Sequence, residues 1–127
     1  MFEQLLQYSD VGFFLLRIAI AVIFIYHGLP KLSKAKEMSL GMGMPAWMIF
    51  LLGAVEVLAS FGLIFGVYAQ LSALLLTLVM LGAIFMKVVK WKVPFSAMDK
   101  MGWEFDFILL FAALAILLGG GGALGFF

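Results

Sequence analysis

The sequence predicts an all-α, membrane-embedded four-helix bundle, and three observations lead to this fold class. Of the 127 residues, 66% are apolar and 12% are charged, whereas soluble domains carry about 25% charged residues. The mean hydropathy is +1.22. Continuous apolar stretches occur four times, each close to the ~20 residues that a bilayer-spanning helix needs. We therefore expect a single four-helix transmembrane domain over 1–127, with helices at about 11–29, 46–66, 69–89 and 104–124.

Prolines and glycines predict where these helices begin and end. Pro30 is expected to stop the first helix, because proline lacks the backbone N–H that continues the helical ladder. Pro45 suits the start of the second helix, where that N–H is not needed. Gly66–Tyr68 is expected to form a tight second connection, and the glycine run 119–122 to fray the last helix. The start of the chain has no basic region, so we expect the first helix to be retained rather than cleaved as a signal peptide.

The lysines predict the orientation. All seven lie in the first connection, 30–45, or in the third, 87–103. The positive-inside rule places such loops in the cytoplasm. We therefore expect both termini on the outer side of a multi-pass protein in the plasma (inner) membrane of a prokaryote, with the lipid bilayer as its main partner. The tryptophans support this, because they lie next to the lysine loops, where indole rings anchor to the membrane surface.

Arg17 and Glu56 are the first candidate functional pair. Both lie inside apolar stretches, and a charge at the bilayer centre costs roughly 2.5–3.5 kcal/mol on insertion scales. Arginine does not readily lose its proton, so it needs a carboxylate, a carbonyl or water. At a rise of 1.5 Å per residue, Arg17 lies about 4–5 Å from its helix midpoint. Glu56 lies near the midpoint of the second stretch, and Thr77 of the third stretch lies at a similar level. We expect a buried Arg17–Glu56 ion pair.

A second candidate layer lies toward the lysine loops. His27 ends the first helix, Lys87 ends the third, and Glu104 begins the fourth. A carboxylate is stabilised at a helix N-terminus by the helix dipole. Asp106 lies about 200° round the helix from Glu104, so at most one of the two faces inward, and we expect this to be Glu104. It shares a stripe with Ile108.

Arg17, Glu56, His27 and Glu104 are thus the candidate catalytic residues. The candidate ligand-binding residues are Lys31, Lys87 and Thr77. Each also has a structural interpretation: the Arg17–Glu56 pair as a staple, and the residues of the second layer as hydrogen-bonding, snorkelling or capping groups at the membrane edge. The nine methionines are most simply packing residues.

The cofactor predictions follow from what the sequence lacks. The chain has no cysteine, so thiolate and iron–sulfur chemistry within it are excluded. A single histidine gives no metal-site pattern. We therefore expect no metal and no cofactor that the chain itself carries as a redox centre. Nothing in the charge distribution predicts a nucleic acid partner.

The order of these residues resembles the DoxX family. The segment LLRIAIAVIFIYHGLPKL carries an arginine in an apolar helix followed by His-Gly-x-x-Lys, filled here by Arg17, His27, Gly28 and Lys31. The intramembrane Glu56 in GAVEVLASFGLIFGVY and the acidic start of WEFDFILLFAALAILLGGGG continue the similarity. The chain ends Gly-Gly-Ala-Leu-Gly-Phe-Phe, without the terminal acid common in the family, so a role for that acid is not carried over.

The resemblance implies a small four-helix membrane protein, and three functions remain open. The first is the membrane subunit of a quinone-linked redox or oxidative-stress system, which binds a quinone between helices and docks a soluble redox partner protein. The second is a small proton-coupled transporter that uses Glu56, working as a homo-oligomer. The third is a non-catalytic assembly protein whose small-residue faces bind partner helices.

Overall fold

The computed structural model describes residues 1–120 and 122, and every element in this part of the chain is helical. The elements are a 3₁₀ helix η1 (Glu3–Tyr8), α1 (Ser9–Ser33), α2 (Ala35–Met42), α3 (Ala46–Phe65), α4 (Ala69–Phe85), the π-helical turn η2 (Met86–Lys90) and α5 (Trp103–Gly119). The starts predicted at 46, 69 and 104 agree with the structure to within one residue.

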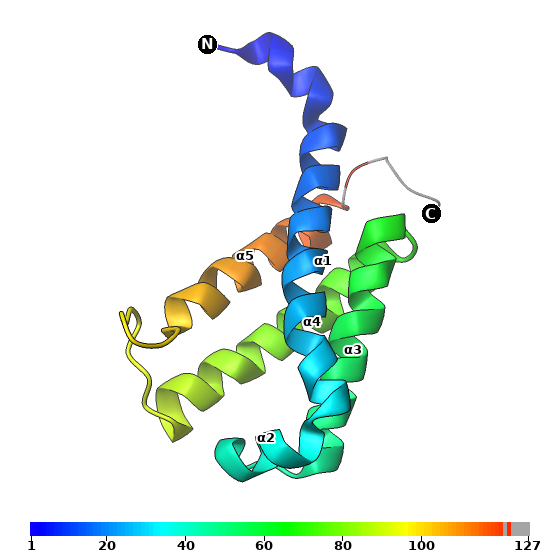
Figure 1. Ribbon diagram of the computed structural model, residues 1–127. Helices are drawn as coiled ribbons and strands as arrows, with labels where there is room; N and C mark the ends of the chain where they lie inside the picture. The colour runs from blue at the N-terminus through cyan, green and yellow to red at the C-terminus, as the bar shows by residue number, and fades with distance from the viewer. Residues whose placement is uncertain (121, 123–127) are drawn as a thin grey trace.

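The long helices form two antiparallel pairs. Figure 1 shows α1 running alongside α3, and α4 alongside α5, with the second pair crossing the first at a marked angle. The short helix α2 lies across the end where α1 passes into α3. At the opposite end, the last turn of α5 reaches the start of α1, where a Cβ built on Gly119 would lie 2.8 Å from the Phe13 ring.

In the described part of the chain, three helical segments are long and apolar enough to cross a membrane: Glu3–Ser33, Ala46–Phe65 and Ala69–Lys90. The fourth long helix, α5, is equally apolar but has 17 residues. It ends earlier than the predicted 124 because Gly120 adopts a left-handed conformation, with φ of 80°, which terminates helices. Positions 121, 123 and 124 of the predicted helix lie outside the described residues.

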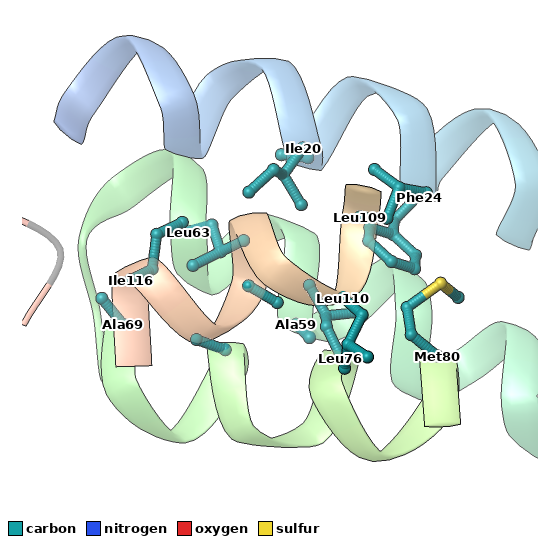
Figure 2. Packing of buried hydrophobic residues seen from close by; sticks show 13 residues of the cluster. Ile20, Phe24, Ala59, Leu63, Ala69, Leu76, Met80, Leu109, Leu110 and Ile116 are labelled. Carbon is teal, nitrogen blue, oxygen red and sulfur yellow. The ribbon is translucent and has the colours of Figure 1, made fainter. Parts of the chain in front are cut away.

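The core lies where the two helix pairs cross. Figure 2 shows it as an interdigitated set of branched, aromatic and small side chains from all four long helices. Its largest fully buried members are Ile20, Phe24, Leu63, Leu76 and Ile116. Many large apolar side chains, such as Leu58 and Leu118, instead lie exposed on the outer faces. A surface of this kind suits lipid rather than water, in agreement with a membrane protein.

Two predictions about the first connection are wrong. The first helix does not stop at Pro30 but continues to Ser33, and the amide of Lys34 still bonds the Pro30 carbonyl. Proline removes only its own N–H from the ladder, and one lost bond in the last turn is tolerable when that turn is packed. The lysine-bearing connection is not a plain loop either. It contains α2, which ends at Gly43 with φ of 68°.

That packing comes from two glycines. A Cβ on Gly28 of α1 would lie 2.9 Å from Val57, and a Cβ on Gly53 of α3 would lie 2.7 Å from the Lys31 Cβ. Since neither residue has a side chain, the α1 and α3 backbones approach closely at this level. The approach places the last turn of α1 directly over the middle of α3.

Candidate functional site

A cavity of about 350 Å³ lies among the helices, at the lysine-bearing end of the molecule. Its wall is mostly apolar, with side chains such as Phe24 and Leu109 on its inner side. Its polar lining is His27, Lys31, Glu56, Lys87 and Asp106. A concave apolar site with a few converging polar groups is the usual form of a small-molecule site.

The first polar wall is an ion pair between α1 and α3. Lys31 Nζ donates to Glu56 Oε1 at 2.5 Å. The Glu56 side chain is 1% exposed and that of Lys31 is 17% exposed. The pair therefore reaches from the buried centre of the molecule, where the Glu56 carboxylate lies, to the cavity mouth, where the apolar stem of Lys31 begins. It exists because α1 continues past Pro30, which carries Lys31 to the level of Glu56.

The second polar wall is an ion pair between η2 and α5. Lys87 Nζ lies 2.6 Å from Asp106 Oδ2, with side chains 18% and 7% exposed. Lys87 belongs to the π-helical turn Met86–Lys90. Such turns are wider than an α-helix and occur frequently at functional sites.

His27 lies between these two walls. It is half-buried, and its ring is 5.5 Å from the ring of Phe105 on α5 and 5.5 Å edge-on from that of Tyr26. It lines the same cavity as both ion pairs. The imidazole can both donate and accept a hydrogen bond, so it can pass a proton between a cavity ligand and a neighbour.

The mouth of the cavity is rich in methionine and is held by two hydrogen bonds. Trp91 Nε1 donates to the Met42 carbonyl at 3.2 Å, and Lys90 Nζ donates to the Gly43 carbonyl at 2.9 Å. These bonds join the end of α2 to η2, so the two lysine-bearing connections lie together, as predicted. The cavity is lined by the methionines Met42, Met44, Met48, Met80, Met86 and Met101. Flexible thioether side chains adapt to ring-shaped ligands and contact aromatic rings favourably.

The predicted Arg17–Glu56 pair is wrong, because Glu56 pairs with Lys31. Arg17 is buried at 1% exposure, and its guanidinium lies 5.4 Å from the centre of the Phe14 ring. The Glu56 Cβ lies opposite Gly28. Arg17 is eleven residues earlier, about 16 Å along the axis of α1 at 1.5 Å per residue. The error lies in the depth estimate, which took the first helix to end at 29.

The predicted choice between the acids of α5 is also wrong. Glu104 is exposed, as is its stripe partner Ile108, whereas Asp106 is 5% exposed and faces the cavity. The sequence does contain a signal that favours Asp106. This residue shares its helix face with Ala113, a small residue seven positions later, and small residues fit a helix packed closely against a neighbour. The large side chains on the Glu104 face, such as Ile108, indicate that this face is directed toward lipid.

Thr77 is buried on α4, but its hydroxyl bonds the Ala73 carbonyl of its own helix at 2.7 Å. It does not line the cavity. The structure thus brings together four of the predicted residues, His27, Lys31, Glu56 and Lys87, and it adds Asp106. Arg17, Thr77 and Glu104 lie outside this group.

One cavity-lining carboxylate oxygen, Glu56 Oε2, makes no hydrogen bond to a described residue, whereas Asp106 Oδ2 faces the Lys87 ammonium. A buried acceptor left without a donor costs about 1–3 kcal/mol, and more when it is charged. Glu56 Oε2 is therefore positioned to accept a hydrogen bond from a molecule in the cavity. Within residues 1–120 and 122, no group of three His, Asp or Glu side chains could hold a metal ion.

Comparison with known proteins identifies the family of this chain. The chain is 30% identical over 114 residues, 87% of its length, to a protein of Bacillus subtilis (strain 168) named "Putative oxidoreductase CatD", of which the match covers 81%. No solved structure matches the chain. Residues 12–91 match the model of the DoxX family. These residues contain His27, both lysines of the ion pairs and Glu56, and this membrane protein therefore belongs to the DoxX family.

Proposed function

We propose that this protein is the membrane subunit of a quinone-linked redox system and that the cavity binds a quinone or its reduced quinol. The observation that carries the proposal is the combination of an apolar cavity of about 350 Å³ with two ion pairs and a histidine on its walls. A quinone ring needs apolar surroundings and a few polar groups at its oxygens. The B. subtilis relative named as an oxidoreductase supports the same class of chemistry.

The residues of the chain would bind the ring and manage protons. Lys31 and Lys87 can donate to ligand oxygens, and the carboxylates of Glu56 and Asp106 can accept from them. His27, between the two pairs, can carry a proton toward the mouth of the cavity. Electrons would come from a soluble redox partner protein, which we propose docks at the lysine-rich end.

The proposed topology follows from the same end of the molecule. We propose that α5 is the fourth spanning helix of a four-helix bundle, since 17 residues is at the short end of the spanning range. The lysine-bearing end would then face the cytoplasm of a prokaryote, with both termini outside the plasma membrane.

The test is to identify what the protein binds. The protein is purified in native lipid nanodiscs, its bound quinones are extracted and quantified, and a short-chain quinone is then titrated while tryptophan fluorescence is followed, since Trp91 lines the cavity. We expect saturable quenching that exceeds that of empty nanodiscs. Glu56→Gln should weaken it, and Glu104→Gln, an exposed acid of α5, should not. Absence of saturable binding to the wild-type protein would refute the proposal.

The transporter alternative has less support. A proton-coupled cation exporter needs a carboxylate that can exchange a proton for a cationic substrate. The Lys31 ammonium already occupies one oxygen of Glu56 at 2.5 Å and competes with such a substrate.

A further inference from the structure

We infer that the cavity selects the reduced, hydroxyl-bearing form of its ring-shaped ligand over the oxidised dione. This inference rests on the proposed function and concerns which member of the redox couple is bound. It comes from the hydrogen-bonding needs of the cavity wall rather than from its size.

The unmet need in the cavity is for donors. Glu56 Oε2 lacks a hydrogen bond, and its side chain is 1% exposed, so solvent does not reach it well. The spare N–H groups of Lys31 and Lys87 are in a different position, because these side chains are 17% and 18% exposed and can be hydrated at the mouth.

The oxidised and reduced members of a quinone couple differ in whether they can donate a hydrogen bond. Each phenolic hydroxyl of a quinol donates one hydrogen bond, so a quinol can satisfy Glu56 Oε2. A dione carries only acceptors, and it would leave Glu56 Oε2 buried without a donor. Since hydrogen bonds to charged groups are the stronger kind, we expect the quinol to bind roughly ten- to hundredfold more tightly.

This preference has a thermodynamic consequence for the couple. Reduction of a quinone takes up two electrons and two protons and converts two C=O groups into two C–OH groups. A site that prefers the product raises the midpoint potential of the bound couple, by about 30 mV for each tenfold preference in a two-electron reaction. The bound ligand would therefore be a better electron acceptor than the free one.

The experiment uses wild-type protein in nanodiscs and a series of ligands with one ring. Trimethylhydroquinone, its mono- and dimethyl ethers and trimethyl-1,4-benzoquinone are titrated without oxygen by calorimetry, with empty nanodiscs as the control. We expect the dimethyl ether and the benzoquinone, which have no hydroxyl, to bind at least tenfold more weakly than the hydroquinone, with the monomethyl ether between them. Because the protein is unchanged, the series does not depend on a variant that folds.

Two variants then test whether Glu56 causes the preference for hydroquinone over benzoquinone. Glu56→Gln replaces one acceptor oxygen by an amide that also donates, so the ratio of hydroquinone to benzoquinone affinity should fall toward one. Glu104→Gln should keep the wild-type ratio. Equal binding of hydroquinone and benzoquinone to the wild-type protein would overturn the inference while leaving the proposed function intact. No binding of any ligand in the series would overturn both.

Discussion

Lys31 of α1 and Glu56 of α3 are joined by a 2.5 Å ion pair at the point where two glycines bring their helices together. The glycines and the ion pair depend on each other. Without Gly28 and Gly53 the backbones could not approach, and without the lysine the buried carboxylate would lack a counter-ion. This contact between α1 and α3 forms one wall of the cavity, so the stability of the contact and the binding of a ligand are linked.

The ion pair predicts a specific pattern in a double-mutant cycle. Lys31→Met leaves the Glu56 charge buried alone, and removing one partner of a buried pair costs roughly 3–5 kcal/mol. The double variant Lys31→Met/Glu56→Leu removes both charges and should recover most of that loss. The measurement is equilibrium unfolding in mixed micelles. If the single and double variants lose equal stability, the pair does not hold the helices as described.

The glycines predict that a larger residue at the contact between α1 and α3 destabilises the protein. Gly53→Ala places a methyl group 2.7 Å from the Lys31 Cβ and 2.8 Å from the Gly28 carbonyl. The helices must then separate, and we expect a loss of about 1–3 kcal/mol, as for an overpacked core. Gly82→Ala is the control, because its added methyl group meets no atom within 4 Å. Its thermal midpoint should stay level or rise, since alanine favours a helix over glycine.

The prediction from sequence was accurate where a local signal exists. The second and third helices begin where Pro45 and the Gly66–Tyr68 turn place them, because these signals act within a few residues of the chain. The pairing of the buried charges was not predictable in this way. It depends on the register of α1 against α3, which is set by the close approach of Gly28 and Gly53.

The same distinction explains the other errors. Pro30 was expected to end a helix, but the tertiary packing of the following turn keeps it helical. Asp106 and Glu104 differ by only two residues, and dipole arguments fit either one. The choice between them depended on the size of the side chains sharing each face. The layer of His27 and Lys87 was predictable because helix ends at one membrane surface lie at one level.

The two acids of α5 give a matched comparison. Asp106→Asn removes the counter-ion of Lys87 and a cavity acceptor, so quinol affinity should fall roughly tenfold or more. Glu104→Gln changes the same charge two residues away on an exposed face and should leave affinity within twofold. Calorimetric titration of both variants with quinol measures the two affinities. Equal effects would show that the charge of α5, rather than the cavity, governs binding.

The volume of the cavity can be tested without changing any charge. Ala83 lines it from α4, and Ala83→Phe should fill part of the space and abolish binding. Ala115→Phe adds the same ring to an exposed position of α5 and should have no effect. Saturable binding by Ala83→Phe at wild-type affinity would place the ligand elsewhere.

The orientation in the membrane can be tested with single cysteines, because the chain has none of its own. Leu40→Cys and Met98→Cys lie at highly exposed positions in the two lysine-bearing connections, and Gln7→Cys lies near the N-terminus. A maleimide that cannot cross the membrane should label only the Gln7 variant in intact cells. Labelling of the other two before lysis would reverse the proposed topology.

The most direct test of the account is to map where a quinone lies. A photoreactive azido-quinone is bound to the wild-type protein in nanodiscs, irradiated, and its attachment sites are found by mass spectrometry of the peptides. We expect attachment to cavity-lining segments, at Met42–Met48 or Met80–Trp91, and loss of this attachment when unlabelled quinol is added. Attachment confined to lipid-facing positions such as Leu58, or unaffected by quinol, would contradict a quinone site between the two ion pairs.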